Sequence, residues 1–264
     1  MIAPQVFHSD QPVRFVAQNA VKKFGIIALA TDLTSERDFA RIIPVDRAGF
    51  YSTRVAFVNP TTPENLRKMS PRLTAAAECI LPGVPLDAIC YSCTAASVVI
   101  GDAEVAAAIN TVRPGVPVVT PTGAARLALA ALGVNRIAVL TPYLIETSEP
   151  MAAYFTGHGF EITRFECFGM DDDREMARVT DDTIIEAVLR LDDPCAQAFF
   201  ISCTGLPSVQ TIAEIETRTG KPVVTSNQAS AWAMMRHAGL DERINGYGRL
   251  FDLNMLPLVT GAVA

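Results

Sequence analysis

The stretch DAICYSCTAAS, from Asp87 to Ser97, reads as the end of a buried strand that breaks into a helix, with Cys93 at the break. A second stretch of the same kind, AQAFFISCTGLPS from Ala196 to Ser208, places Cys203 at the matching break. In a parallel sheet, ligands gather beyond the C-terminal ends of the strands, which is where both cysteines fall. The two stretches therefore predict a fold that brings two sulfurs to opposite sides of one small cleft.

Around these stretches, continuous apolar runs alternate with segments that carry helix-start and helix-stop residues. The predicted strands cover residues 23–30, 53–58, 87–91, 117–120, 136–141, 161–168, 197–202 and 222–225. The predicted helices cover residues 36–41, 64–81, 97–110, 123–132, 146–156, a segment from about 175, 182–191, 208–219 and 228–237. This alternation predicts an α/β fold with mostly parallel strands.

An internal repeat divides the chain. GVPVVTPTGAARLALAALG, from Gly115 to Gly133, resembles GKPVVTSNQASAWAMMRHAG, from Gly220 to Gly239, and the preceding strand-Cys-Thr segments also correspond. We therefore predict two pseudo-symmetric lobes, each a short, mostly parallel sheet flanked by helices, with the active site in the cleft between them. Lobe 1, on the Cys93 side, is assigned residues 1–120 and 226–264, and lobe 2, on the Cys203 side, is assigned residues 121–225.

The composition describes a globular protein with a large core, since half of its 264 residues are apolar. Its 22 basic and 28 acidic residues include no long basic run, so we expect neither a nucleic acid nor a membrane as a partner. The sequence shows no secretion signal and no transmembrane-length apolar run, which predicts a cytoplasmic protein. Its six cysteines are spread through the chain, which favours reduced thiols over a disulfide framework.

A cysteine at a strand-to-helix turn faces backbone N–H groups that stabilise a thiolate. Two such thiols across a cleft can act on one carbon, where one removes a proton while the other donates one. Two plainer readings are weighed against this one: buried cysteines that only fill a core, and a redox pair formed by Cys90 and Cys93. The second is disfavoured because Cys90 lies inside the predicted strand.

Three further side chains accompany the cysteines. Thr94 and Thr204 follow them directly, and their hydroxyls and amides could hold a carboxylate or enolate oxygen. Tyr143 lies at a strand end, where it is either a hydrogen-bond donor at the mouth of the cleft or an ordinary aromatic. The three histidines have no metal-ligand spacing, and no nucleophile elbow, dinucleotide-binding or Walker A motif occurs, so we expect no metal or cofactor.

Over about residues 25–239 the chain resembles the aspartate/glutamate racemase superfamily. The resemblance is carried by the two strand-Cys-Thr turns, by TPY at 141–143, and by the segments ISCTGL and KPVVTSNQASAW. Within the superfamily the chain is most similar to the branch of maleate cis-trans isomerase and arylmalonate decarboxylase, and YSCTAASVVIGD, from Tyr91 to Asp102, is most similar to the ectoine-utilisation proteins.

The resemblance implies two lobes around a shared active site. Cys93 and Cys203 would be its two catalytic cysteines, Tyr143 would bind a substrate carboxylate, and the amides of Thr94 and Ala95 would form an oxyanion-binding turn. Because the decarboxylase has glycine at the first cysteine position, the presence of Cys93 favours an isomerase or racemase.

Two positions depart from the maleate isomerases, which place asparagines where this chain has Asp32 and Asp173. An ionised aspartate repels a second substrate carboxylate. Together with these two aspartates, the resemblance implies a cofactor-independent racemase, epimerase or cis-trans isomerase for a small carboxylate that bears an amino or acylamino group, as in ectoine or hydroxyectoine catabolism.

Two other functions stay open. One is decarboxylation of a malonate-type acid with Cys203 as the proton donor, and the other is non-catalytic binding of a small carboxylate. The apolar C-terminal tail from Leu250 to Ala264 and the habit of the family it resembles suggest a homo-oligomer.

Overall fold

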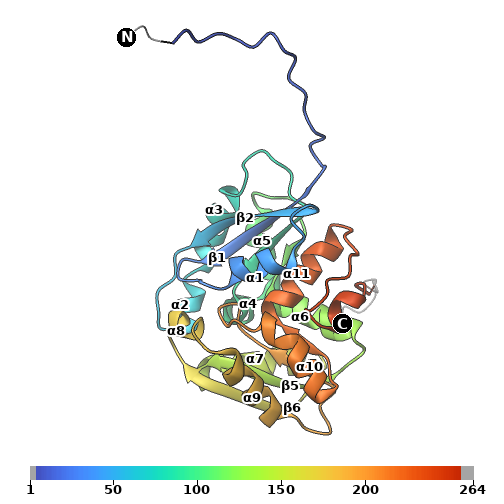
Figure 1. Cartoon of the computed structure of the whole chain (residues 1–264). Coiled ribbons are helices and arrows are strands. Elements are labelled where there is room, and N and C mark those ends of the chain that lie inside the picture. The colour runs from blue at the N-terminus through green and yellow to red at the C-terminus, as the bar shows by residue number, and fades with distance from the viewer. Residues whose placement is uncertain (1–3, 257–264) are drawn as a thin grey trace.

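The computed structural model describes residues 4–256, and these contain two four-stranded sheets whose strand pairs are all parallel. In spatial order, the first sheet contains β2 (Ala48–Val55), β1 (Lys22–Leu29), β3 (Ala88–Ser92) and β4 (Val118–Val119). The second contains β6 (Glu161–Met170), β5 (Arg136–Tyr143), β7 (Ala198–Ile201) and β8 (Val223–Thr225). Figure 1 shows β1 and β2 of the first sheet well separated from β5 and β6 of the second, with helices around both.

The two sheets have the same order of strands. In each sheet, the strand that comes first in sequence (β1 or β5) is central, and the third in sequence (β3 or β7) pairs with it. Phe24 thus lies beside Ala88 in one sheet, and Ile137 lies beside Ala198 in the other. The inner strands are almost wholly buried, which explains their continuous apolar runs. Each candidate cysteine follows the third strand of its sheet, so the repeat seen in the sequence corresponds to a repeated sheet.

Helices cover both sheets. Those before β5 are α1 (Ser35–Ile42), α2 (Pro63–Arg67), α3 (Leu73–Glu78), α4 (Thr94–Ile100), α5 (Asp102–Asn110) and α6 (Pro121–Ala131). The later ones are α7 (Ile145–Gly157), α8 (Asp173–Met176), α9 (Asp181–Leu191), α10 (Ile212–Thr219) and α11 (Ser226–His237). Single 3-10 turns form η1 (Ser70–Arg72), η2 (Val209–Thr211) and η3 (Arg249–Asp252).

Threonine side chains cap the N-termini of several of these helices. Thr62, Thr120, Thr180 and Thr225 each accept the backbone N–H three residues later, the bond that an N-cap side chain makes. At Thr120 and Thr225 the cap directly joins β4 to α6 and β8 to α11, which places the strand end and the helix start at the same edge of each sheet.

Three element predictions are wrong in detail. The strand predicted for 53–58 starts earlier, because β2 is an edge strand with a partly polar face that shows no continuous apolar run. The helix predicted for 64–81 divides into α2, η1 and α3 and ends at Glu78. The helix predicted for 97–110 begins at Thr94 and breaks at Gly101, whose φ of 101° is accessible mainly to glycine. The helix predicted for 208–219 is present as η2 and α10, and the chain turns between Cys203 and η2.

Helix α11 packs against α1, α6 and β3 and also contacts β8, so it touches elements of both sheets. The lobe boundaries, including the assignment of 226–264 to lobe 1, stay a prediction. Figure 1 shows residues 4–21, before β1, leading away from the body. Residues 257–264 of the apolar tail lie outside the described residues. Within residues 4–256, no helix combines the length and the apolar character needed to cross a bilayer.

Candidate active site

Both candidate cysteines line one small cavity between the two sheets. Its volume is about 20 Å³, room for about one water molecule. The lining residues are Leu29, Asp32, Thr61, Cys93, Ala95, Tyr143, Asp173, Met176, Cys203, Thr204 and Gly205. All eight predicted site residues except Thr94 are therefore brought together here.

Cys93 lies where β3 ends and α4 begins, as the sequence predicts. It is the N-cap residue of α4, and its carbonyl accepts the backbone N–H of Ser97 at 3.0 Å. Burial raises the pKa of the Cys93 thiol, and the neighbouring Cys203, Asp32 and Asp173 raise it further, while a hydrogen bond from the Ala96 amide opposes them. The helix start thus supplies one donor to a sulfur that is otherwise in an apolar and negatively charged place.

Cys203 lies in a different kind of turn. Its φ is 101°, a conformation that residues with a side chain rarely adopt, and no helix begins behind it. Instead, the backbone N–H of Gly205 donates to Cys203 Sγ at 3.2 Å. Burial raises the pKa of Cys203 to about 12, against the lowering influence of Tyr143 and the amides of Gly205 and Leu206. The prediction that a helix N-terminus faces this sulfur is therefore wrong. The backbone N–H groups of a tight turn donate to it instead.

Tyr143 is the last residue of β5 and is buried in the wall of the cavity, whereas the sequence suggested a position just beyond the strand. Burial raises its pKa well above the ordinary value, and both cysteine sulfurs add to the effect. The phenol therefore keeps its proton and is a hydrogen-bond donor at neutral pH.

The two aspartates of the cavity are held by neutral donors. Asp32 Oδ1 accepts the backbone N–H groups of Thr34 at 2.8 Å and Ser35 at 2.9 Å, and the Ser35 hydroxyl donates to Oδ2. Burial raises the pKa of Asp32. Asp173 accepts a hydrogen bond from Asn59 Nδ2 at 2.9 Å and another from the Thr31 hydroxyl. No Lys, Arg or His is among the residues that line the cavity, as far as residues 4–256 define it.

The two predicted threonines are used differently from the expectation. The Thr94 hydroxyl donates to Ser226 Oγ at 2.8 Å, and Thr94 does not line the cavity. Thr204 lines it, but its hydroxyl donates to the Ser92 carbonyl at 3.1 Å. Both hydroxyls thus join segments of the protein, and the idea that they hold a substrate oxygen is not supported by these bonds.

Sequence reasoning missed four lining residues, Leu29, Thr61, Met176 and Gly205. Thr61 and Met176 come from segments without any motif, and only the fold shows that they reach the cavity. Gly205 could have been noticed, because it follows Cys203 closely in a turn. Among residues 4–256, no group of three or more His, Cys, Asp or Glu is arranged to hold a metal ion. The absence of a cofactor stays a prediction.

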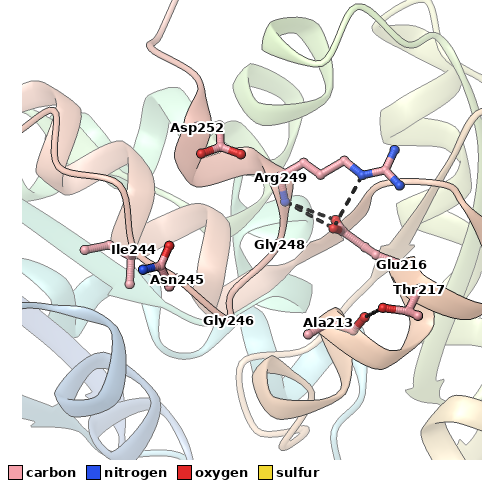
Figure 2. A pocket seen from close by; sticks show the side chains of 9 residues that line it. All are labelled: Ala213, Glu216, Thr217, Ile244, Asn245, Gly246, Gly248, Arg249 and Asp252. Atoms are coloured by element: carbon pink, nitrogen blue, oxygen red, sulfur yellow. Dashed lines mark hydrogen bonds and ion pairs between the residues drawn. The ribbon is translucent and has the colours of Figure 1, made fainter.

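A wider cavity of about 370 Å³ lies between α10 and the segment that leads into η3 (Figure 2). In Figure 2 the Glu216 carboxylate points at Arg249, whose backbone N–H donates to it at 3.2 Å. Glu216 also accepts the backbone N–H of Val223 at 3.0 Å. The carboxylate therefore fastens the C-terminal segment to the body, and none of the predicted site residues lines this cavity.

The profile of the arylmalonate decarboxylase family matches residues 84–251, more than half of the chain. The chain belongs to the arylmalonate decarboxylase family. Among its relatives, the arylmalonate decarboxylase of Bordetella bronchiseptica is 36% identical over 141 residues, which cover 52% of this chain and 59% of that protein. The maleate isomerase of Nocardia farcinica is 27% identical over 241 residues, 87% of this chain and 95% of that protein.

The same fold occurs in a solved structure of the Nocardia farcinica maleate cis-trans isomerase, which matches this family member with a TM-score of 0.81. The two are 24% identical over 88% of this chain and 98% of that one. That structure is of a cysteine-to-serine mutant with a covalently bound succinylcysteine intermediate. The predicted fold class and the predicted branch of maleate isomerases and arylmalonate decarboxylases are confirmed. The closer likeness to ectoine-utilisation proteins stays a prediction.

Proposed function

We propose that the protein is a cofactor-independent isomerase in which Cys93 and Cys203 act together on a small carboxylate. One observation carries the proposal: two thiols, each just beyond the end of the third strand of its own sheet, line the same small cavity. A family that includes isomerases and decarboxylases supports this reaction class.

In the racemase or epimerase form, one thiolate takes the proton from the carbon beside the carboxylate. The electron pair moves into the carboxylate to give an enediolate, and the opposite thiol returns a proton to the other face. The Tyr143 hydroxyl and the turn amides near Ala95 would donate to the enediolate oxygens. One sulfur must first lose its proton, and the amides of Ala96 or Gly205 favour that form.

In the cis-trans form, the Cys93 thiolate would add to one alkene carbon while the Cys203 thiol gives its proton to the other carbon. After rotation about the new single bond, the Cys203 thiolate would take that proton back, and the C–S bond would break to re-form the alkene as the other isomer and release the Cys93 thiolate. The succinylcysteine of the Nocardia farcinica enzyme is an adduct of this kind in that protein.

For the substrate, we propose a monocarboxylate with an ammonium or acylamino group. Two carboxylates and no cationic side chain line the cavity of the described chain, so a second substrate carboxylate would meet like charge in a buried place. An ammonium group would balance that charge and would also favour a thiolate beside it. An amino acid or acylamino acid from ectoine or hydroxyectoine breakdown fits this chemistry, and the sequence resemblance suggests it.

Decarboxylation of a malonate-type acid is the second candidate, favoured by the 36% identity to the Bordetella bronchiseptica decarboxylase. There Cys203 alone would supply the proton, so that Cys93→Ala would keep most of the activity. Cytoplasmic location and homo-oligomerisation stay predictions from the sequence.

The test is a panel of small carboxylic, amino and acylamino acids offered to wild type, Cys93→Ala and Cys203→Ala. Isomer ratio, carbon dioxide release and solvent deuterium at the α-carbon are measured for each. We expect isomerisation in the wild type and its loss by about 10²-fold to 10⁴-fold in both variants. Carbon dioxide release that survives in Cys93→Ala would instead identify a decarboxylase. Tight binding without turnover would identify a binding protein.

A further inference from the structure

Helix α11 opens with the sequence Thr225-Ser226-Asn227-Gln228, whose two outer residues cap the helix. The Thr225 hydroxyl accepts the backbone N–H of Gln228 at 3.3 Å, and Gln228 Oε1 accepts the backbone N–H of Thr225 at 3.0 Å. This reciprocal pair is a capping box. The side chains of Ser226 and Asn227 are therefore not needed to cap the helix, and both make contacts outside it.

The Ser226 hydroxyl connects the two cysteine turns. Its oxygen accepts the backbone N–H of Cys203 at 3.1 Å and the hydroxyl of Thr94, the residue after Cys93, at 2.8 Å. Ser226 is fully buried, so water does not compete for these bonds. One hydroxyl group thus fixes the start of one cysteine turn relative to the end of the other.

Asn227 holds the same turn from its other side. Its Nδ2 donates to the Thr204 carbonyl at 2.9 Å and to Asp38 Oδ2 in α1 at 2.8 Å. The backbone of Cys203 and Thr204 is therefore bound at its N–H by Ser226 and at the following carbonyl by Asn227. Neither of these side chains lines the cavity.

Cys203 requires such bonds because of its backbone conformation. A φ of 101° is unfavourable for a residue with a side chain, and it persists only where neighbouring groups impose it. In this conformation Cys203 Sγ accepts the Gly205 N–H and faces the cavity. If the turn relaxed, the sulfur would lose that donor and its direction toward the cavity.

We propose that Ser226 and Asn227 are positioning residues that hold Cys203 in its catalytic direction by imposing the backbone conformation of its turn. The inference rests on the proposed two-cysteine function for its catalytic meaning, although its structural part needs no substrate. Loss of the Ser226 hydroxyl misdirects one of two sulfurs without removing any substrate contact. For a substrate that is turned over, kcat should fall by about tenfold to a hundredfold while KM changes much less.

The experiment measures the alkylation rate of each cysteine by iodoacetamide as a function of pH, with peptide mass spectrometry to assign the sites. The variants are Ser226→Ala, Ser226→Thr and Asn227→Ala. Ser230→Ala is the matched control, because this buried serine of the same helix donates to its own helix, to the Ser226 carbonyl at 2.8 Å. Alkylation requires no turnover, so its outcome is separate from the success of the proposed function.

We expect Ser226→Ala to change the pH profile of Cys203 and to leave that of Cys93 nearly unchanged. The Cys203 profile should move to higher pH, because the thiolate loses the Gly205 donor. Ser226→Thr should restore the wild-type profile, and Asn227→Ala should act in the same direction as Ser226→Ala. A wild-type Cys203 profile in folded Ser226→Ala would overturn the proposal, as would an equal shift of both cysteines that Ser230→Ala reproduces. If Ser226→Ala does not fold, Asn227→Ala decides by the same criterion.

Discussion

Asn59 and Asp173 join the two halves of the protein at the cavity, with Asn59 Nδ2 donating to Asp173 Oδ1 at 2.9 Å. Asn59 follows β2, whereas Asp173 begins α8, so the bond spans 114 residues of sequence. Beside it, the backbone N–H of Thr61 donates to the Asp171 carbonyl at 2.7 Å. These bonds join two segments that line the cavity of about 20 Å³ through Thr61 and Asp173, and we expect the segments to separate when a substrate enters.

Asn59→Ala should therefore open the cavity. We expect both cavity cysteines to be alkylated several-fold faster at a fixed pH, with a loss of about 1–3 kcal/mol in the free energy of unfolding, the cost of leaving a buried acceptor without its hydrogen-bond partner. Peptide mass spectrometry and thermal denaturation measure the two effects. Asn65→Ala, which removes a bond to the Pro60 carbonyl on the exposed side of the same segment, is the control. Unchanged alkylation rates in Asn59→Ala would show that this contact does not limit access.

Tyr143→Phe tests the proposed donor to the enediolate. Because the buried phenol keeps its proton, its loss removes a hydrogen bond that strengthens as charge develops, and kcat should fall by about 10²-fold to 10³-fold. The Cys203 alkylation profile should also move to higher pH, since Tyr143 lowers the pKa of that thiol. Tyr154→Phe is the matched control, because Tyr154 donates to Asp102 outside the cavity. Equal losses in the two variants would assign Tyr143 a packing role only.

Asp32→Asn tests which substrate the cavity selects. Replacing the carboxylate by an amide removes one negative charge, so KM for an amino-bearing substrate should rise by about tenfold to a hundredfold, and binding of dicarboxylates should improve. Steady-state kinetics with both substrate types give the comparison, and Asp46→Asn on the surface is the control. Better turnover of maleate with unchanged turnover of amino acids would contradict the assignment of Asp32 to an ammonium or N–H group.

The buried Asp38 should make the free energy of unfolding depend on pH. It is buried, and burial raises its pKa from 3.8 to about 7, against the lowering influence of Asn227 and Arg41. Between these values the folded protein keeps a proton that the unfolded chain has released, so the free energy of unfolding falls as pH rises from about 4 to about 7. Asp38→Asn should flatten this dependence.

Thermal denaturation of wild type and Asp38→Asn at pH 4 and pH 8 measures the difference. The wild type should lose more stability than the variant between these two conditions. An Asp10→Asn variant in the exposed N-terminal segment should follow the wild type. Parallel curves for wild type and Asp38→Asn would show that Asp38 titrates at similar pH in the folded and unfolded chains.

Much of the architecture could be predicted because it depends on local patterns. Buried parallel strands require continuous apolar runs, and helix caps and stops are short motifs, so the order of elements and the α/β class could be read from the chain. The helix break at Gly101 and the bounds of the edge strand β2 were harder to predict from the sequence. A glycine that breaks a helix and a partly polar strand both resemble other local structures until their neighbours in space are known.

The candidate site likewise has features that local sequence patterns predict and others that depend on neighbours in space. The sequence by itself determined that Cys93 and Cys203 occupy matching strand ends, because the internal repeat contains both the strand and the Cys-Thr pair that follows it. Tertiary structure alone decided what surrounds each sulfur. Cys93 is at a helix start and Cys203 is in a strained turn, and Thr94 binds Ser226, a residue 132 positions away, where the sequence suggested a substrate ligand. Such partners are chosen by the direction of side chains across the two sheets, which no local pattern in the chain encodes.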